Sequence, residues 1–193
     1  GKENGFATIG VIRGEELAFK IEENPTLKKA QEAGMQLVFV TREVYREKEN
    51  QVFLDQLKSK YGNFYLVPEG GTNQLAVQGC EEILTPEDRC FNYICCAVGT
   101  GGTISGLINS ANPNQKILGF PALKGDFLSN DIRKFAKNDN WELITDFTFG
   151  GYAKVTSEYI SFLNTFSQNT KIPLDPVYTG KMVYGVLQLI EQN

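Results

Sequence analysis

One stretch of this sequence is apolar at nearly every position, the run Phe91–Val98. A strand with one solvated face alternates apolar and polar residues, whereas a strand covered on both faces is apolar almost throughout. A glycine-rich turn follows the run directly, and a helical pattern follows the turn. We therefore expect a buried strand in a sheet that carries helices on both faces.

Strand-like and helix-like stretches alternate along the whole chain. The expected strands are 6–12, 35–40, 64–67, 91–98, 117–120 and a short run near 141–145. The expected helices are 25–33, 51–61, 72–84, 104–110, 127–137, 157–166 and a last helix from about 181. This alternation predicts an α/β protein with mostly parallel, twisted sheets and helices on both faces.

Composition excludes several classes of function. The chain has 193 residues, a net charge of −4 and no histidine. Without a basic excess we expect no nucleic-acid partner, and nothing in the composition indicates a membrane span. Without histidine there is no Ser-His-Asp triad, no Cys-His pair and no histidine metal ligand. The four cysteines form no C-x-x-C motif, which favours free thiols, no metal site and a cytoplasmic location.

The sharpest local motif is the glycine-rich run Gly99, Thr100, Gly101, Gly102 and Thr103. It follows the buried strand and opens a helix. Small residues let several backbone N–H groups point into one concavity, and the helix N-terminus adds partial positive charge. The run lacks the Lys-Ser/Thr of a Walker A loop, and Ile104 stands where a dinucleotide fingerprint has its third glycine. It predicts a phosphate site, with a tight strand–helix turn that binds nothing as the alternative.

A second glycine turn, Glu69-Gly-Gly-Thr72, also follows an expected strand and opens an expected helix. By itself it is better explained by a structural turn in which Thr72 caps the helix.

The motif Asp175-Pro-Val-Tyr-Thr-Gly-Lys181 precedes the last expected helix. It would hold Tyr178 and Thr179 at a helix N-terminus that faces the same end of the sheet. A phenol has a pKa near 10, so it acts as a base only where a cation or a cofactor lowers that pKa. A tyrosine packed in a turn is the alternative, and Gly150-Gly-Tyr152 is a weaker motif of the same kind.

Three stretches taken together resemble a known family. They are 66–79, which contains Pro-Glu-Gly-Gly-Thr-Asn, 97–106, which contains Gly-Thr-Gly-Gly-Thr, and 175–181, which reads Asp-Pro-Val-Tyr-Thr-Gly-Lys. Their order and spacing resemble the 1-aminocyclopropane-1-carboxylate deaminase / D-cysteine desulfhydrase family. These are pyridoxal-phosphate enzymes of the tryptophan-synthase-β-like fold.

The resemblance implies roles for individual residues. Gly99, Thr100, Gly101, Gly102 and Thr103 would hold the phosphate of pyridoxal phosphate. The other three implied site residues are Tyr178 as the active-site tyrosine, Tyr152 as a second one, and Thr179 beside the pyridine nitrogen of the cofactor. The residues after Tyr152 depart from the family pattern.

Thr179 also bears on the reaction that the resemblance implies. The cyclopropane deaminases carry a glutamate there, and the D-cysteine desulfhydrases resemble this sequence at that position and at Gly70–Asn73. We therefore favour β-elimination from D-cysteine, to pyruvate, sulfide and ammonia, over deamination of the cyclopropane substrate. The resemblance also implies a homodimer that acts on a small amino acid.

Some parts of the family pattern have no match in this sequence. The lysine that carries the cofactor near the family's N-terminus, the Ser-Asn-His stretch after it and the closing C-terminal strand are not found. We expect the chain to be the central part of a longer enzyme and not to turn over alone. Residues 1–61 would be the remnant of a smaller α/β domain, and residues 62–193 the larger cofactor-phosphate domain. A non-catalytic phosphate- or nucleotide-binding α/β module, or a purely structural domain, would be the alternatives.

Overall fold

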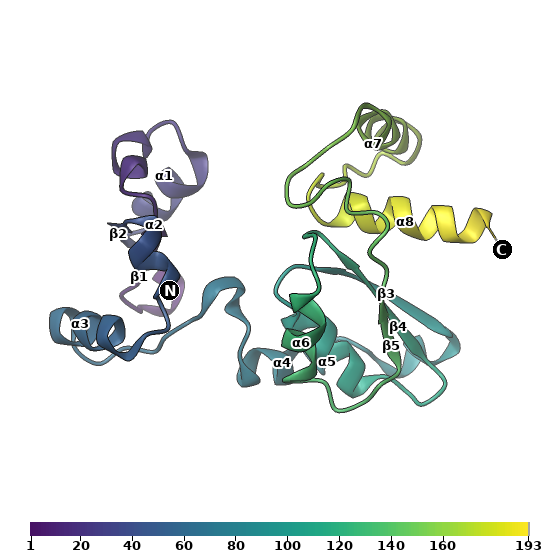
Figure 1. The fold of residues 1–193 in the computed structure, drawn as a ribbon, viewed down its shortest axis with the longest axis horizontal. Helices are drawn as coiled ribbons and strands as arrows, with labels where there is room; N and C mark the ends of the chain where they lie inside the picture. Colours follow the sequence, from purple (N-terminus) through teal and green to yellow (C-terminus); the bar gives the residue numbers. More distant parts are fainter. Residues whose placement is uncertain (193) are drawn as a thin grey trace. The chain divides into compact units, whose positions relative to one another are not determined.

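The structure is a computed structural model that describes residues 1–192. The chain forms two compact units, Gly1–Tyr65 and a larger one from Leu66 onward. Figure 1 shows them in colours that follow the sequence. The sequence places a boundary four residues earlier, between 61 and 62, and the functional roles assigned to the two parts stay predictions.

The first unit contains a pair of parallel strands. β1 (Ile9–Arg13) pairs with β2 (Gln36–Val40), with Ile9 opposite Gln36. The other elements of this unit are η1 (Lys2–Asn4), η2 (Glu15–Lys20), α1 (Pro25–Glu32), α2 (Arg42–Arg46) and α3 (Gln51–Tyr61). The side chain of Asn24 caps α1 by accepting from two backbone N–H groups, as its place before Pro25 predicts.

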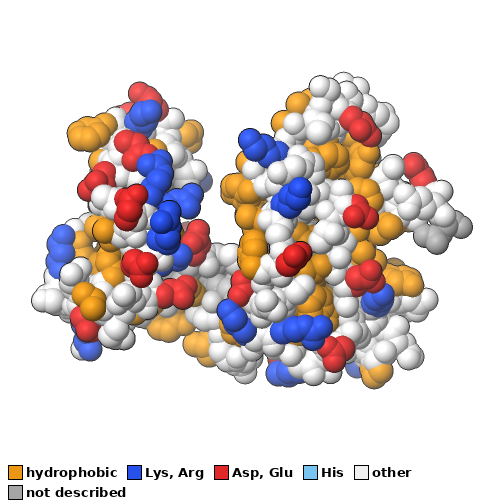
Figure 2. Space-filling view, in the orientation of Figure 1, with side chains coloured by type: hydrophobic (Ala, Val, Ile, Leu, Met, Phe, Trp, Pro, Cys, Tyr) orange, Lys and Arg blue, Asp and Glu red, His pale blue; other side chains and the backbone are white. Residues whose placement is uncertain are grey.

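The first unit has a charged surface segment over residues 42–49. Residues 42–49 are mostly exposed, and Arg42 pairs with Glu16. Figure 2 shows positive and negative side chains interspersed over this unit. Mixed charge of this kind is typical of a solvated surface.

The second unit contains a three-stranded parallel sheet in the order β3-β4-β5. Its strands are β3 (Tyr93–Val98), β4 (Lys116–Pro121) and β5 (Trp141–Leu143). Its helices are η3 (Glu69–Gly71), α4 (Gln74–Cys80), η4 (Pro86–Cys90), α5 (Gly102–Ser110), α6 (Phe127–Arg133), α7 (Ser157–Thr170) and α8 (Thr179–Glu191).

Helices cover both faces of this sheet, as the apolar run in β3 predicts. Successive strand residues point to opposite faces. On β4, Gly119 faces Ile104 of α5, whereas the next residue, Phe120, lies against Gly185 of α8. The apolar core lies on the α5 side, where Ile108 and Ile117 are fully buried. The predicted α/β class is confirmed.

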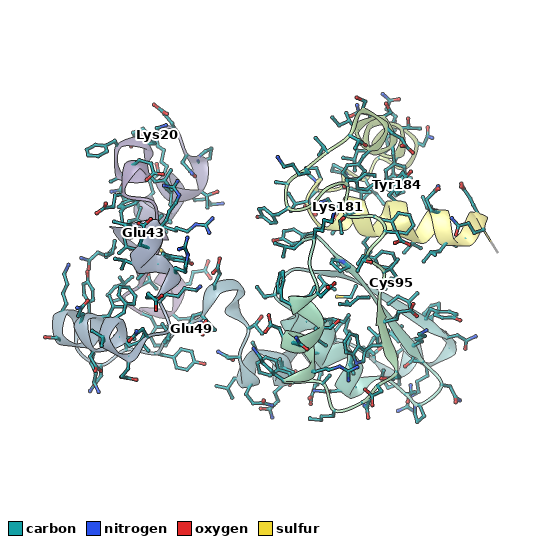
Figure 3. The ribbon with its side chains drawn as sticks, viewed as in Figure 1. Lys20, Glu43, Glu49, Cys95, Lys181 and Tyr184 are labelled. Atoms are coloured by element: carbon teal, nitrogen blue, oxygen red, sulfur yellow. The ribbon has the colours of Figure 1, made fainter. Side chains whose placement is uncertain are left out.

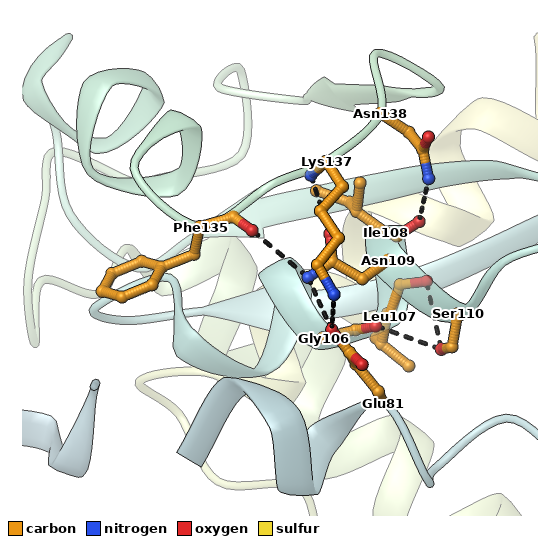
Figure 4. A network of polar contacts seen from close by, with 9 residues as sticks. All are labelled: Glu81, Gly106, Leu107, Ile108, Asn109, Ser110, Phe135, Lys137 and Asn138. Carbon is orange, nitrogen blue, oxygen red and sulfur yellow. Dashed lines mark hydrogen bonds and ion pairs between the residues drawn. The ribbon is translucent and has the colours of Figure 1, made fainter. Parts of the chain in front are cut away.

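Helices α4 and α5 run side by side and in the same direction. Gly106 allows the close approach, because a Cβ there would overlap Cys80. Near the C-terminal ends, Asn109 donates to Glu81 (2.8 Å), and Lys137 pairs with the same carboxylate (2.8 Å). Figure 4 shows this network. Because the C-terminal ends are tied together, the N-terminal ends of the two helices lie at the same end of the unit.

The expected and observed elements differ most at two places. Residues 64–67, expected as a strand, pair with no strand among the described residues, and all four are exposed. A strand requires a hydrogen-bonding neighbour, which apolar character alone does not provide. The helix expected over 72–84 is the shorter α4, which starts later because Asn73 rather than Thr72 caps it and which ends at Cys80. Among the described residues, no helix is both long enough and apolar enough to cross a membrane.

Candidate phosphate and tyrosine site

The loop Gly99–Thr103 joins the C-terminal end of β3 to α5. Gly101 precedes the helix with a φ of +89°, a left-handed conformation that glycine adopts without strain. Among the described residues, no side chain caps α5. The first hydrogen bond of the helix runs from the Ser105 N–H to the Gly101 carbonyl (3.1 Å). The N–H groups of residues 102–104 lie before this bond, in the first turn of the helix. Uncapped N–H groups at a helix N-terminus favour an anion there.

The second glycine turn lies directly against this loop. The hydroxyl oxygens of Thr72 and Thr100 are 2.6 Å apart, a hydrogen bond between the two turns. Together the turns line an open cavity of about 310 Å³. The lining residues are Gly70–Thr72, Ala76, Cys80, Ala97–Ile104 and Tyr178. The structure thus brings both glycine turns and Tyr178 to one cavity.

Residues that fit a phosphate would provide hydrogen-bond donors and leave space for the anion. The cavity provides backbone N–H groups at the start of α5 and the hydroxyls of Thr72, Thr100 and Thr103. Thr100 and Thr103 are exposed, so both can reach a ligand. No lysine and no carboxylate line the cavity among the described residues. The donor set therefore fits the phosphate group of a cofactor.

Tyr178 and Thr179 are placed by the carboxylate of Asp175. This carboxylate accepts from the N–H groups of Val177 and Tyr178 (both 2.9 Å) and from the N–H of Thr179 (2.8 Å). The Thr179 hydroxyl donates to it as well (2.7 Å). Burial raises the pKa of Asp175, but these hydrogen bonds outweigh burial and leave the pKa below its usual value. Asp175 therefore anchors the start of α8.

Tyr152 and Tyr178 meet edge to face, with ring centroids 6.2 Å apart. Tyr178 lies against Gly99, where an added Cβ would be 3.2 Å from its ring. Burial, followed by the hydrogen bond and charge of Tyr152, raises the pKa of Tyr178. The phenol is therefore protonated at neutral pH. It can donate a hydrogen bond, and it acts as a base only where a bound group lowers its pKa.

Thr179 does not line the cavity, and its predicted place beside a pyridine nitrogen stays a prediction. Its hydroxyl already makes two hydrogen bonds to Asp175: it donates to the carboxylate and accepts from the backbone N–H (3.2 Å). One lone pair of the hydroxyl oxygen is left for a further partner.

The sequence reasoning missed Lys181, which is 1% exposed. Its ammonium group donates to the carbonyls of Gly151 (2.7 Å), Thr148 (2.8 Å) and Ala122 (3.3 Å). Burial lowers the pKa of this lysine. Figure 3 labels it at the start of α8. In the sequence it reads as an ordinary first-turn lysine, and no local signal marks it as buried.

Comparison with known proteins gives a consistent result, although no family model matches the chain. A protein from Pyrococcus horikoshii, provisionally named a 1-aminocyclopropane-1-carboxylate deaminase, is 28% identical over 100% of this chain and 63% of its own length. A crystal structure of a protein described as an ACC deaminase homologue superposes with a TM-score of 0.80. That superposition covers 99% of this chain and 63% of the other, at 25% identity.

This chain is similar to proteins named 1-aminocyclopropane-1-carboxylate deaminase and D-cysteine desulfhydrase. An Arabidopsis thaliana relative, 28% identical over 83% of this chain and 46% of its own length, is named as bifunctional for both activities and as mitochondrial. A Klebsiella pneumoniae relative, 27% identical over 67% of this chain, is named D-cysteine desulfhydrase. The chain spans 63% of the length of the Pyrococcus horikoshii relative. The predicted resemblance and fold are confirmed.

Proposed function

We propose that the loop Gly99–Thr103 binds the phosphate group of pyridoxal phosphate. The observation that carries this proposal is the uncapped N-terminus of α5, which opens into a cavity lined by threonine hydroxyls. Backbone N–H groups and hydroxyls at a helix N-terminus are a general solution for phosphate binding. Thr72 would support the loop through its hydrogen bond to Thr100.

For the whole protein we propose a pyridoxal-phosphate lyase that acts on a small amino acid. The names of the relatives include both deamination of the cyclopropane acid and desulfhydration of D-cysteine. We favour D-cysteine, which would give pyruvate, sulfide and ammonia. The support for this preference is the hydroxyl residue Thr179 and the turn Gly70–Asn73, both of which resemble the desulfhydrases.

In this proposal the cofactor, when bound, supplies an electron sink for the bonds at the substrate's α-carbon. Tyr178 acts on the substrate with a hydroxyl that keeps its proton at neutral pH, because its pKa is raised. Tyr152 packs edge to face with the Tyr178 ring and restricts its orientation. Thr179 would lie beside the cofactor ring, and Asp175 keeps its hydroxyl oriented.

A non-catalytic phosphate- or nucleotide-binding module is the second candidate. The observation in its favour is that no lysine lines the cavity among the described residues. Such a module needs the phosphate site but no group that joins covalently to the ligand. It predicts that a nucleotide binds at least as tightly as pyridoxal phosphate.

Calorimetric titration of the chain tests these proposals. Pyridoxal phosphate is compared with pyridoxal, which lacks the phosphate, and with adenosine monophosphate, and inorganic phosphate serves as competitor. We expect pyridoxal phosphate to bind at least tenfold more tightly than the other two. Tighter binding of the nucleotide supports the second candidate, and no binding of any phosphate refutes both.

A matched pair of threonine variants locates the site. Thr103→Val removes an exposed hydroxyl in the first turn of α5, and Thr165→Val removes an exposed hydroxyl from α7. A hydrogen bond to a charged group contributes about 1.5–3 kcal/mol. We expect Thr103→Val to weaken binding by about tenfold or more and Thr165→Val to leave it unchanged. Equal affinities in both variants would place the phosphate elsewhere.

A separate activity assay tests the preference for D-cysteine over the cyclopropane acid. Sulfide release from D-cysteine and 2-oxobutanoate release from the cyclopropane acid are measured side by side with the full-length protein. Faster turnover of the cyclopropane acid would overturn the preference for D-cysteine. On the resemblance alone we also propose a homodimer in the cytoplasm, to be checked by light scattering and by microscopy of a tagged protein.

A further inference from the structure

A buried ammonium group holds the loop between β5 and α7 in place. Lys181 meets the carbonyls of Thr148 and Gly151 on this loop and of Ala122 after β4. In the described residues, no ion pair of Lys181 with a carboxylate is found, so the three carbonyls are its partners. A buried charge without such partners would be strongly destabilising. Two segments of the second unit therefore meet at one side chain of a third, α8.

The loop that Lys181 holds contains four residues with left-handed backbone conformations. Phe149, Gly150, Gly151 and Ala153 all have positive φ values, of 51°, 93°, 120° and 55°. Left-handed conformations cost free energy for residues other than glycine and persist where surrounding contacts impose them. Tyr152 lies within this series of residues. Its position thus depends on contacts made by the loop around it.

Tyr178, the ring that Tyr152 contacts, is the N-cap residue of the helix that contains Lys181. Tyr178 immediately precedes α8, and Lys181 lies in the first turn of that helix. The ammonium group therefore joins the loop that carries Tyr152 to the helix that carries Tyr178. The Gly151 carbonyl, adjacent to Tyr152 in sequence, is its nearest partner at 2.7 Å.

We infer that Lys181 is a positioning residue whose ammonium group sets Tyr152 against Tyr178, the tyrosine that lines the cavity. The roles of the two tyrosines rest on the proposed function. The contact between their rings, and the effect of Lys181 on that contact, are independent of it. The competing explanation is aromatic packing, because Phe149 stacks on the buried Tyr159 with centroids 4.3 Å apart. If that stacking suffices, the tyrosine pair survives loss of the ammonium group.

Fluorine NMR of protein labelled with 3-fluorotyrosine tests the inference without cofactor. Tyr152→Phe and Tyr178→Phe assign the two signals. In the wild-type background we expect Tyr152→Phe to shift the Tyr178 signal, because it removes the hydroxyl that is hydrogen-bonded to Tyr178. Absence of this shift overturns the inference before any lysine is changed.

Lys181→Met is the decisive variant, since it keeps the length of the side chain and removes the charge. In Lys181→Met we expect the Tyr178 signal to move toward its position in Tyr152→Phe. Adding Tyr152→Phe to Lys181→Met should then leave the Tyr178 signal unchanged. Lys154→Met is the matched control, because Lys154 is exposed and two residues from Tyr152. An unchanged Tyr178 response in Lys181→Met, or an equal loss in Lys154→Met, refutes the inference.

Rescue with a small amine separates positioning from general destabilisation. Lys181→Ala leaves space for propylammonium, which supplies the missing atoms and charge. We expect propylammonium chloride, but not tetramethylammonium chloride, to restore the coupling between the two tyrosine signals. Failure to restore it overturns the inference even where Lys181→Met is unfolded. Because no cofactor is present, failure of the proposed function would appear separately, as lost binding of pyridoxal phosphate with the tyrosine coupling intact.

Discussion

Gly102, the first residue of α5, provides a direct test of the phosphate site. A Cβ added here would lie 2.8 Å from the Thr72 hydroxyl oxygen and 3.4 Å from the Thr72 Cβ and Cγ2. Thr72 would have to move, and its hydrogen bond to Thr100 (2.6 Å) would be strained or lost. Gly102→Ala therefore disturbs the contact between the two glycine turns and occupies space at the helix N-terminus.

The expected effects on stability and binding differ in size. Loss of one neutral hydrogen bond lowers the free energy of unfolding by about 0.5–1.5 kcal/mol. Replacing glycine by alanine in a helix raises it by up to about 1 kcal/mol. The free energy of unfolding should therefore change by only about 1 kcal/mol, which shifts Tm by roughly 2–4 °C. Loss of one hydrogen bond to a charged phosphate costs about 1.5–3 kcal/mol, or roughly ten- to a hundredfold in affinity.

Gly79→Ala is the matched control. Gly79 lies in α4, where an added Cβ would meet no atom within 4 Å. This variant should gain about 0.5–1 kcal/mol of stability and keep its affinity. Titration with pyridoxal phosphate gives the affinity, and thermal unfolding followed by circular dichroism gives Tm. Wild-type affinity in folded Gly102→Ala would refute the assignment of the phosphate to this loop.

Three further predictions concern stability and reactivity. Ile108→Ala, at a fully buried core position, should lower the free energy of unfolding by about 2–5 kcal/mol in urea, whereas Leu75→Ala, at a residue 64% exposed, should change it by less than about 0.5 kcal/mol. The lowered pKa of Asp175 means that its stabilising effect is complete above the unfolded pKa of about 3.9 and is lost as pH falls through the lower folded pKa. Asp175→Asn should therefore flatten the acid limb of a plot of Tm against pH, and an unchanged limb would contradict the assignment. Burial, with smaller contributions from neighbouring thiols, raises the pKa of Cys96 to about 12, so iodoacetamide at pH 8 should modify the exposed Cys90 first and reach Cys96 only in urea, as peptide mass spectrometry would show.

Local patterns predicted those elements whose signals lie within a few residues. Asn24 and Pro25 marked the start of α1, and α3 spans the predicted 51–61. The apolar run before Gly99 predicted a strand covered on both faces, and the glycines after it predicted the turn into α5. Caps, turns and periodicity act between neighbours in sequence, so they can be recognised without the fold.

Residues 64–67 show where this reasoning fails. They are as apolar as a strand, yet a strand exists only where a neighbouring strand pairs with it, and no strand among the described residues pairs with 64–67. In the same way, Thr72 has the sequence of a helix cap but is bonded to Thr100, 28 residues away. Its neighbour Asn73 performs the capping.

The sequence by itself determined the alternation of strands and helices, the glycine turn at the end of β3 and the motifs that carry the family resemblance. Only the tertiary structure decided that two glycine turns share one cavity and that Tyr152 lies against Tyr178. It alone revealed the buried ammonium of Lys181 among three carbonyls. Those carbonyls lie 30 to 59 residues away along the chain. The physical reason is that burial and hydrogen-bond partners at such separations depend on how the layers pack, and a lysine carries the same local signal whether its ammonium group ends in water or in the core.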